Sequence, residues 1–143
     1  SLIMLDIDFF KQYNDNYGHL VGDQVLEILT STIRKHIKAT DLVGRWGGEE
    51  FIIALPHATG LQAYKVAQRI RKTLAAIKLT DRDAKPIPPP TVSQGIAVFP
   101  DDSDDLFGLI DRADQRLYQA KERGRDQIEP KLEFWQPPSL SDE

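Results

Sequence analysis

The sequence predicts an α+β fold in which helices pack on the faces of a mixed β-sheet. Two observations carry this prediction: two strand-like runs flank a tight glycine turn, and helical stripes separate the other strands. In chain order the expected elements are β-α-α-β-β-α-β-α, followed by a short final strand. Because a hairpin lies between helical crossovers, a ferredoxin-like sandwich with a central hairpin fits this order best.

The first half of the chain supplies a strand, two helices and the hairpin. Residues 2–7 are a short apolar run typical of a buried strand, and residues 9–17 are typical of a short helix that ends at Gly18-His19. A longer helix follows, because apolar residues recur at three- and four-residue steps from position 21 to 37. Residues 42–46 and 51–55 are strand-like, and the two glycines between them permit a tight, acidic turn.

The second half adds two helices and a long strand. Apolar stripes over 63–77 and 106–117 predict helices, and residues 91–99 predict a strand between them. The prolines at positions 86 to 90 predict an extended loop that cannot join a central strand, and Gln127-Ile128 is a candidate edge strand.

Two divisions of the chain follow from these patterns. We expect one domain over residues 1–129 and a proline-rich acidic tail over residues 130–143 that serves as a linker. Because Ser1 leads directly into an apolar strand, we expect the start of the domain to be truncated.

Composition and charge narrow the possible functions. The chain of 143 residues is long enough for one domain, and its lack of cysteine excludes disulfides, thiolate zinc sites and a cysteine nucleophile. A net charge of −4 argues against a broad nucleic-acid surface, so we expect no nucleic-acid partner. No apolar run approaches the roughly 18 residues of a membrane span. We expect a cytoplasmic domain without membrane contact, in a parent protein that can itself be membrane-anchored.

Four carboxylates are expected to meet where the first strand and the hairpin end. Asp6 and Asp8 close the strand, and Glu49 and Glu50 form the turn. Two like charges about 4 Å apart repel by about 4 kcal/mol at an effective dielectric of about 20, so the cluster needs protonation, separation or a cation. Hard oxygen ligands favour Mg²⁺ or Mn²⁺. The spacing alone leaves two interpretations open, a metal site and acids that are simply solvated.

The hairpin is one of several motifs that occur together. Arg45-Trp46-Gly47-Gly48-Glu49-Glu50-Phe51 resembles the signature of the GGDEF domains of diguanylate cyclases. Other segments resemble that family in the same order across residues 2–128: Asp6-Ile7-Asp8-Phe9-Phe10-Lys11, Asn14-Asp15, Gly18-His19, Gly22-Asp23, Ala113-Asp114, Leu117-Tyr118, Ala120-Lys121 and Gly124-Arg125. The resemblance implies a nucleotide-cyclase palm fold and the Mg²⁺-dependent condensation of two GTP molecules into cyclic di-GMP.

The resemblance also implies roles for individual residues. The carboxylates of Asp6 and Glu49 and the backbone carbonyl of Ile7 would bind Mg²⁺ or Mn²⁺, with Glu49 as proton acceptor and Glu50 as a supporting acid. The other implied residues bind substrate: Phe9, Phe10 and Lys11 through amides at a helix start, Asn14 and Asp23 at the guanine edge, His19 near the substrate, Gly47 and Gly48 beside the nucleotide, and Lys121 and Arg125 at the phosphates.

One family feature is altered in this chain. Many members carry an inhibitory product site with an Arg-x-x-Asp core before the hairpin, and the matching segment here is Lys38-Ala39-Thr40-Asp41. Lysine lacks the planar fork that binds guanine and phosphate bidentately. We therefore predict weak or absent feedback inhibition, although Asp41 and the auxiliary Arg69 are retained.

The implied partners are GTP and a second copy of the domain. Because each domain would present one GTP, the resemblance implies a catalytic homodimer, assembled by an N-terminal sensor or dimerisation domain outside this chain. Two alternatives stay open: a catalytically silent module that binds GTP or cyclic di-GMP, and a related nucleotidyl cyclase or polymerase palm with another product. The intact carboxylates disfavour the first alternative, and Asp23 with the Gly-Gly-Glu-Glu-Phe hairpin disfavours the second.

Overall fold

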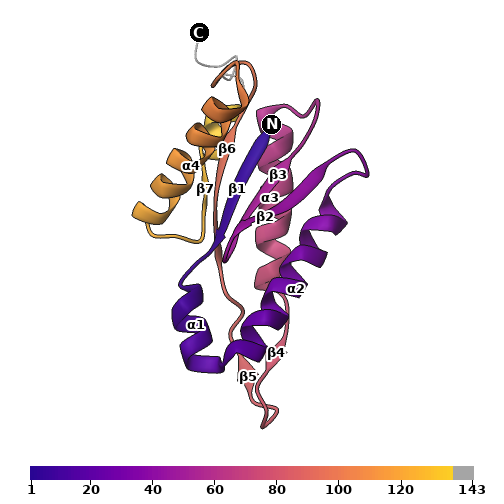
Figure 1. Ribbon diagram of the computed structural model, residues 1–143, viewed down its shortest axis with the longest axis vertical. Coiled ribbons are helices and arrows are strands. Elements are labelled where there is room, and N and C mark those ends of the chain that lie inside the picture. The colour runs from indigo at the N-terminus through magenta and orange to yellow at the C-terminus, as the bar shows by residue number, and fades with distance from the viewer. Residues whose placement is uncertain (137–143) are drawn as a thin grey trace.

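The computed structural model describes residues 1–136 and contains a five-stranded mixed sheet with helices on both faces (Figure 1). The strand order is β2 (Leu42–Gly47), β3 (Glu50–Ala54), β1 (Leu2–Ile7), β6 (Val92–Ala97) and β7 (Ile128–Glu129). β1 pairs antiparallel with β3 and β6, and β7 pairs parallel with β6. The predicted α+β class is confirmed, as are the hairpin and the short edge strand, but the hairpin lies at one edge of the sheet and not at its centre as predicted.

β1 is buried along its whole length because strands flank both of its edges and helices cover both of its faces. Side chains alternate between the faces of a strand. Ile3, Leu5 and Ile7 enter the larger core, whereas Leu2 and Met4 enter a smaller core on the opposite face. By the same alternation Asp6 follows Leu2 and Met4 onto the face of the smaller core.

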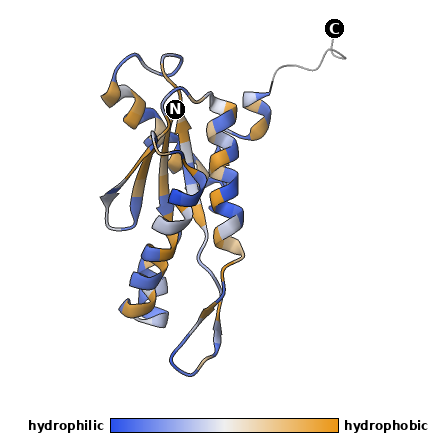
Figure 2. Cartoon of the chain, turned by 90° about the vertical axis from the view of Figure 1, so that its right-hand side faces the viewer, coloured by the Kyte–Doolittle hydropathy of each residue, from blue (hydrophilic) through white to orange (hydrophobic). Residues whose placement is uncertain are grey.

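The helices divide between these two cores. α2 (His19–His36) and α3 (Gly60–Ala75) cover the larger core, and α4 (Leu106–Glu122) covers the smaller one with Ala113 and Leu117. The strands are largely apolar, while the helices carry both apolar and polar residues (Figure 2). This distribution is that expected of amphipathic helices on a buried sheet.

α4 lies unusually close to the sheet because a glycine faces it. A Cβ atom on Gly95 of β6 would come within 2.2 Å of the Ala113 carbonyl oxygen and 2.3 Å of the Leu117 nitrogen. Both atoms belong to the helix backbone, which cannot move aside alone. Gly95 therefore sets the depth of α4, and with it the position of residues at the end of that helix.

α1 (Phe10–Tyr17) is fastened to the proline-rich loop. The Tyr13 hydroxyl donates to the Pro88 carbonyl at 3.2 Å, and burial, followed by the neighbouring Tyr17, raises the pKa of Tyr13 to about 12. This loop differs from the predicted extended segment, because Pro86–Ile87 (β5) pairs with Leu79–Thr80 (β4) in a small separate hairpin. The prolines nevertheless stay out of the central sheet, as predicted.

Residues 130–136 are the part of the expected tail that the structure describes. They include the short helix α5 (Leu132–Trp135), and the Trp135 ring packs so closely on α3 that a Cβ on Gly60 would lie 2.2 Å from it. Residues 137–143 lie outside the described part of the chain. None of the helices in residues 1–136 is long and apolar enough to cross a bilayer.

Gly95→Ala is expected to destabilise the domain by about 1–3 kcal/mol or more, because the added methyl group would push α4 off the sheet. Denaturant unfolding would measure the loss. Gly44→Ala in β2 is the matched control, since its Cβ would make ordinary contact with Ile52 at 3.5 Å. Equal stability of the two variants would contradict the assigned depth of α4.

Candidate active site

A polar cleft opens where β1 ends against the β2–β3 hairpin, the start of α1 and the end of α4. Its volume is about 220 Å³, and its lining combines acidic, basic and loop residues: Asp6, Ile7, Asp8, Phe9, Phe10, Lys11, Gln12, Glu49, Lys121 and Arg125. The structure thus brings together the predicted metal ligands and the predicted phosphate-binding residues, including Asp6 and Lys121, which are 115 positions apart in sequence.

Asp6 is the buried acid of this cleft. Its Oδ2 accepts a hydrogen bond from the Lys121 ammonium, whereas its Oδ1 is buried without any hydrogen-bond partner among the described residues. Burial raises the pKa of Asp6; Lys121 opposes this effect, and Glu49 and Asp8 add to it. A buried carboxylate oxygen without a donor is costly, so it marks a position at which a cation would be stabilised.

Glu50 lies directly across the β1–β3 pairing from Asp6. Burial raises the pKa of Glu50, and Asp6, Asp114 and Glu49 raise it further while Lys121 lowers it. The neighbouring Glu49 joins the cleft through the hairpin turn, whose backbone meets β1 where the Ile7 amide donates to the Glu49 carbonyl at 3.4 Å. The two glutamates therefore extend the negative charge of Asp6 along one edge of the sheet.

The donor set fits a hard cation that is shared with a ligand. Within residues 1–136 no group of three or more His, Cys, Asp or Glu side chains is placed to hold a metal ion by itself. Asp6 and Glu49 offer carboxylate oxygens, and Mg²⁺ is commonly bound by one or two carboxylates together with substrate phosphates and water. The residues present are compatible with that mode.

Asp8 lines the same cleft, but unlike Asp6 it has hydrogen-bond donors on both of its carboxylate oxygens. Its Oδ1 accepts from the Ser93 hydroxyl at 2.6 Å, and its Oδ2 accepts from the Thr91 hydroxyl at 2.6 Å and the Asp126 amide at 2.9 Å. Neither oxygen lacks a partner. The motif spacing could not reveal these donors, because they lie 83 to 118 residues away.

The loop after β1 is shaped for anions. Phe9 precedes α1 in a left-handed conformation, with φ 52°, and no side chain caps the helix start. The first-turn amides at Phe10 and Lys11 therefore have no intrahelical acceptor. Arg125 lies over the exposed Phe9 ring, 4.3 Å from its centre, and Lys121 approaches from α4. One side of the cleft is therefore lined by the cationic side chains of Lys121 and Arg125 and by the free amides at the start of α1.

Three predicted substrate residues do not line this cleft: Asn14 lies on α1, and His19 and Asp23 lie in the first turns of α2. Asn14 packs against Gly22 so tightly that a Cβ there would lie 1.7 Å from Asn14 Oδ1, an atom buried without a partner. Asp23 follows Gly22 on α2 and is exposed, as is His19 at the start of that helix. Gly22 is the residue that sequence reasoning left without a specific role, and the structure shows that it makes room for Asn14.

The tip of the β2–β3 hairpin has empty space where Gly47 and Gly48 would carry side chains. A Cβ at either residue would meet no other atom within 4 Å, and Gly48 has a positive φ of 34°. Arg45 holds the turn, because its Nε donates to the Gly48 carbonyl at 2.7 Å. The tip therefore has a fixed backbone with free space beside it.

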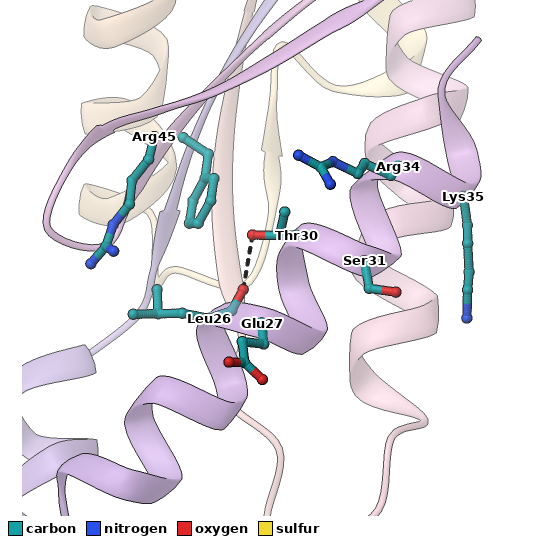
Figure 3. A pocket seen from close by; sticks show the side chains of 8 residues that line it. Leu26, Glu27, Thr30, Ser31, Arg34, Lys35 and Arg45 are labelled. Atoms are coloured by element: carbon teal, nitrogen blue, oxygen red, sulfur yellow. Dashed lines mark hydrogen bonds between the residues drawn. The ribbon is translucent and has the colours of Figure 1, made fainter. Parts of the chain in front are cut away.

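A larger cavity, of about 550 Å³, lies between α2 and the strands β2 and β3 (Figure 3). Its lining includes the cations Arg34, Lys35 and Arg45 and the apolar side chains of Leu26 and Phe51. None of the predicted catalytic, substrate or metal residues lines it. The smaller cleft is the better candidate active site, because it holds the unpartnered Asp6 oxygen and lies beside the acids of raised pKa.

The residues of the altered inhibitory motif also come together. Lys38, Asp41 and Arg69 line one cavity of about 260 Å³, and the Lys38 amide donates to Asp41 Oδ2 at 2.7 Å. The backbone bond shows that Asp41 shapes its own turn. Whether this cavity binds the cyclic dinucleotide stays a prediction.

Comparison with known proteins identifies the class of domain. The family described as "Diguanylate cyclase, GGDEF domain" matches residues 1–127, and the chain belongs to this family. Diguanylate cyclase A of Treponema denticola is 40% identical over 128 residues, and the match covers 90% of this chain and 34% of the relative. Diguanylate cyclase DgcP of Pseudomonas aeruginosa is 42% identical over 129 residues, covering 90% and 19%. The chain spans about a third or less of these relatives.

Solved structures agree with the family assignment. The GGDEF domain of PA1120 from Pseudomonas aeruginosa superposes with a TM-score of 0.81 at 34% identity, covering 89% of this chain and 78% of that one. The GGEEF domain of a diguanylate cyclase from Vibrio cholerae, described as active, gives a TM-score of 0.74 at 35% identity, covering 89% and 79%. The predicted palm sandwich is thereby confirmed.

Glu50→Gln is expected to raise the Tm at neutral pH, by about 2–4 °C for each kcal/mol gained. Because the pKa of Glu50 is raised in the folded protein, its ionised form costs stability above that pKa, and the cost disappears as the pH falls through it. The gain should therefore shrink in acid. Thermal unfolding across pH would measure it, with exposed Glu122→Gln as control; a pH-independent gain would contradict the explanation.

Proposed function

We propose that this chain is the catalytic domain of a diguanylate cyclase, which condenses two GTP molecules into cyclic di-GMP and two pyrophosphates. The observation that carries the proposal is the unpartnered, buried Oδ1 of Asp6, in a cleft that also contains Glu49, Lys121 and Arg125. A cation-accepting acid beside anion-binding groups suits a nucleoside triphosphate with its metal ion.

Each group of residues has a distinct part in this proposal. Lys121, Arg125 and the amides at the start of α1 bind the β- and γ-phosphates by charge-assisted hydrogen bonds. Asn14 and Asp23 bind the guanine edge, Asn14 through hydrogen bonds of its amide group and Asp23 as the acceptor for the ring N1 and the exocyclic amine. The bare tip at Gly47 and Gly48 lets the hairpin backbone approach the nucleotide.

Asp6, Glu49 and the Ile7 carbonyl would hold the Mg²⁺ or Mn²⁺ ion, which supplies electrophilic activation of the α-phosphate and acidifies the attacking hydroxyl. Glu49 accepts the proton that the hydroxyl loses. Glu50, whose pKa is raised by burial, supports the negative field at the same edge of the sheet. Because Asp6 is buried, its carboxylate would interact with the metal ion at a lower effective dielectric constant than in water, which strengthens the attraction.

The reaction requires two copies of the domain. The 3′-hydroxyl oxygen of one GTP forms a bond to the α-phosphorus of the other, the α–β bridging bond breaks, and pyrophosphate leaves with the electron pair; the same exchange in the opposite direction closes the ring. One cleft offers one set of ligands, so two clefts must face each other. The dimerising element is expected outside this chain.

Production of cyclic di-GMP from GTP tests the proposal directly. The domain fused to a dimerising coiled coil should form the product with Mg²⁺, and Glu49→Gln should reduce the rate by at least about 100-fold because it loses a ligand and proton acceptor. Mass spectrometry would measure the product. GTP binding without product would favour the silent regulatory module, and product from ATP would refute the guanine assignment.

Lys38→Arg is expected to tighten cyclic di-GMP binding by about tenfold or more, because the guanidinium restores bidentate bonding that lysine lacks. Calorimetry on the wild-type and variant domains would measure the affinity. Lys72→Arg on exposed α3 surface serves as the control. Tight binding already in the wild-type protein would contradict the prediction of weak feedback.

A further inference from the structure

Asp8 is a buried carboxylate that the proposed chemistry leaves without a task. The residue is 5% exposed, and it forms no ion pair with any basic residue of the described chain. Its oxygens are instead engaged by the hydroxyls of Thr91 and Ser93 and by the Asp126 amide. Asp8 also lines the candidate cleft. Because donors from within the protein already engage both of its oxygens, its effect passes through the groups that it holds.

The amide that Asp8 holds belongs to a strained turn. Arg125 and Asp126 follow α4 with φ values of 62° and 50°, a region that non-glycine residues rarely adopt. Arg71 of α3 fixes the same turn from outside, because its Nε donates to the Asp126 carboxylate at 2.9 Å and to the Asp126 carbonyl at 3.0 Å. Asp126 is therefore held on two sides, by Asp8 and by Arg71.

This turn places Arg125 in the cleft. The Arg125 guanidinium lies over the ring of Phe9, which directly follows Asp8 in sequence. Asp8 thus connects the two sides of the phosphate-binding region. Its backbone continues into the loop that begins at Phe9, and its carboxylate holds the turn that carries Arg125. A shift of the turn would change the distance between the guanidinium and the loop amides.

We propose that Arg71, Asp126 and Asp8 form a positioning relay that fixes Arg125 against the phosphate-binding loop. Arg71 then contributes to nucleotide affinity without contacting the nucleotide. It does not line the candidate active site; it lines a separate cavity of about 200 Å³ together with Asp126 and Lys131. This inference rests on the proposed function in one respect: the ligand that Arg125 binds is taken to be the triphosphate of GTP.

A double-mutant cycle tests whether Arg71 acts through Arg125. Arg71→Met keeps the apolar stem but removes the donor, and it should weaken binding of a non-hydrolysable GTP analogue by about tenfold. Arg125→Met should weaken binding more, and the double variant should be no weaker than Arg125→Met alone, since the two residues act in series. Arg71→Lys, which can restore one of the two bonds, should recover part of the affinity.

Calorimetry would measure these affinities, with Lys72→Met as the control because this exposed neighbour lies on the same helix. The Tm of each variant would separate lost positioning from lost stability. Strictly additive effects of Arg71→Met and Arg125→Met would overturn the relay, as would unchanged affinity in Arg71→Met.

Amide resonances test the relay even if the wild-type domain binds no nucleotide, an outcome that would count against the proposed function. In Arg71→Met the shifts should extend from Asp126 to Arg125 and Phe9, whereas Lys72→Met should leave these residues unchanged. Asp8→Asn should move the Asp126 amide upfield and speed its hydrogen exchange, because the charged acceptor is lost. Shifts confined to α3 and Asp126 would overturn the proposal.

Discussion

A negative charge held at the end of a buried strand is the constraint on which the rest of this domain depends. The Asp6 side chain is only 7% exposed, and the Lys121 ammonium of α4 is the cation that accompanies it. This pairing is possible only because α4 runs close to the sheet, a separation that Gly95 sets through its lack of a side chain. Fold and site are therefore connected through one close helix–sheet contact, and a change in either Gly95 or Lys121 affects both.

The two aspartates of the first strand show how one short motif provides two different environments. Asp6 retains a buried oxygen without a partner, and burial raises its pKa. Asp8, two residues later, has neutral donors on both oxygens. Their separation follows from where β1 ends: Asp6 is still paired with β3 and β6, whereas Asp8 has left the strand and meets the start of β6 and the turn after α4. Position relative to the strand end, rather than residue type, decides which acid is free to bind a cation.

The sequence predicts the elements in which apolar residues recur at regular spacing, and the site residues that lie in contiguous motifs. β1, the β2–β3 hairpin and the three long helices were predictable because their apolar patterns are regular over many residues. The β4–β5 hairpin and α5 were not, since two-residue strands and a four-residue helix are too short to produce a pattern. The contact of Arg71 with Asp126 was equally hidden, because a hydrogen bond between residues 55 positions apart depends on tertiary packing and has no local signal.

Backbone strain points to the same part of the molecule as the electrostatics. Of the five non-glycine residues with positive φ in the described chain, Phe9 and Arg125 line the small cleft, Asp126 directly follows Arg125, and only His57 and Ala84 lie elsewhere. Such conformations each cost on the order of 1–3 kcal/mol and persist only where neighbouring bonds over-determine them. Here the bonds are those of Asp8 and Arg71 to the strained turn. The large cavity beside α2 has greater volume but none of these residues in its lining. Strain, an unpartnered acid and converging cations therefore mark the functional cleft more clearly than volume does.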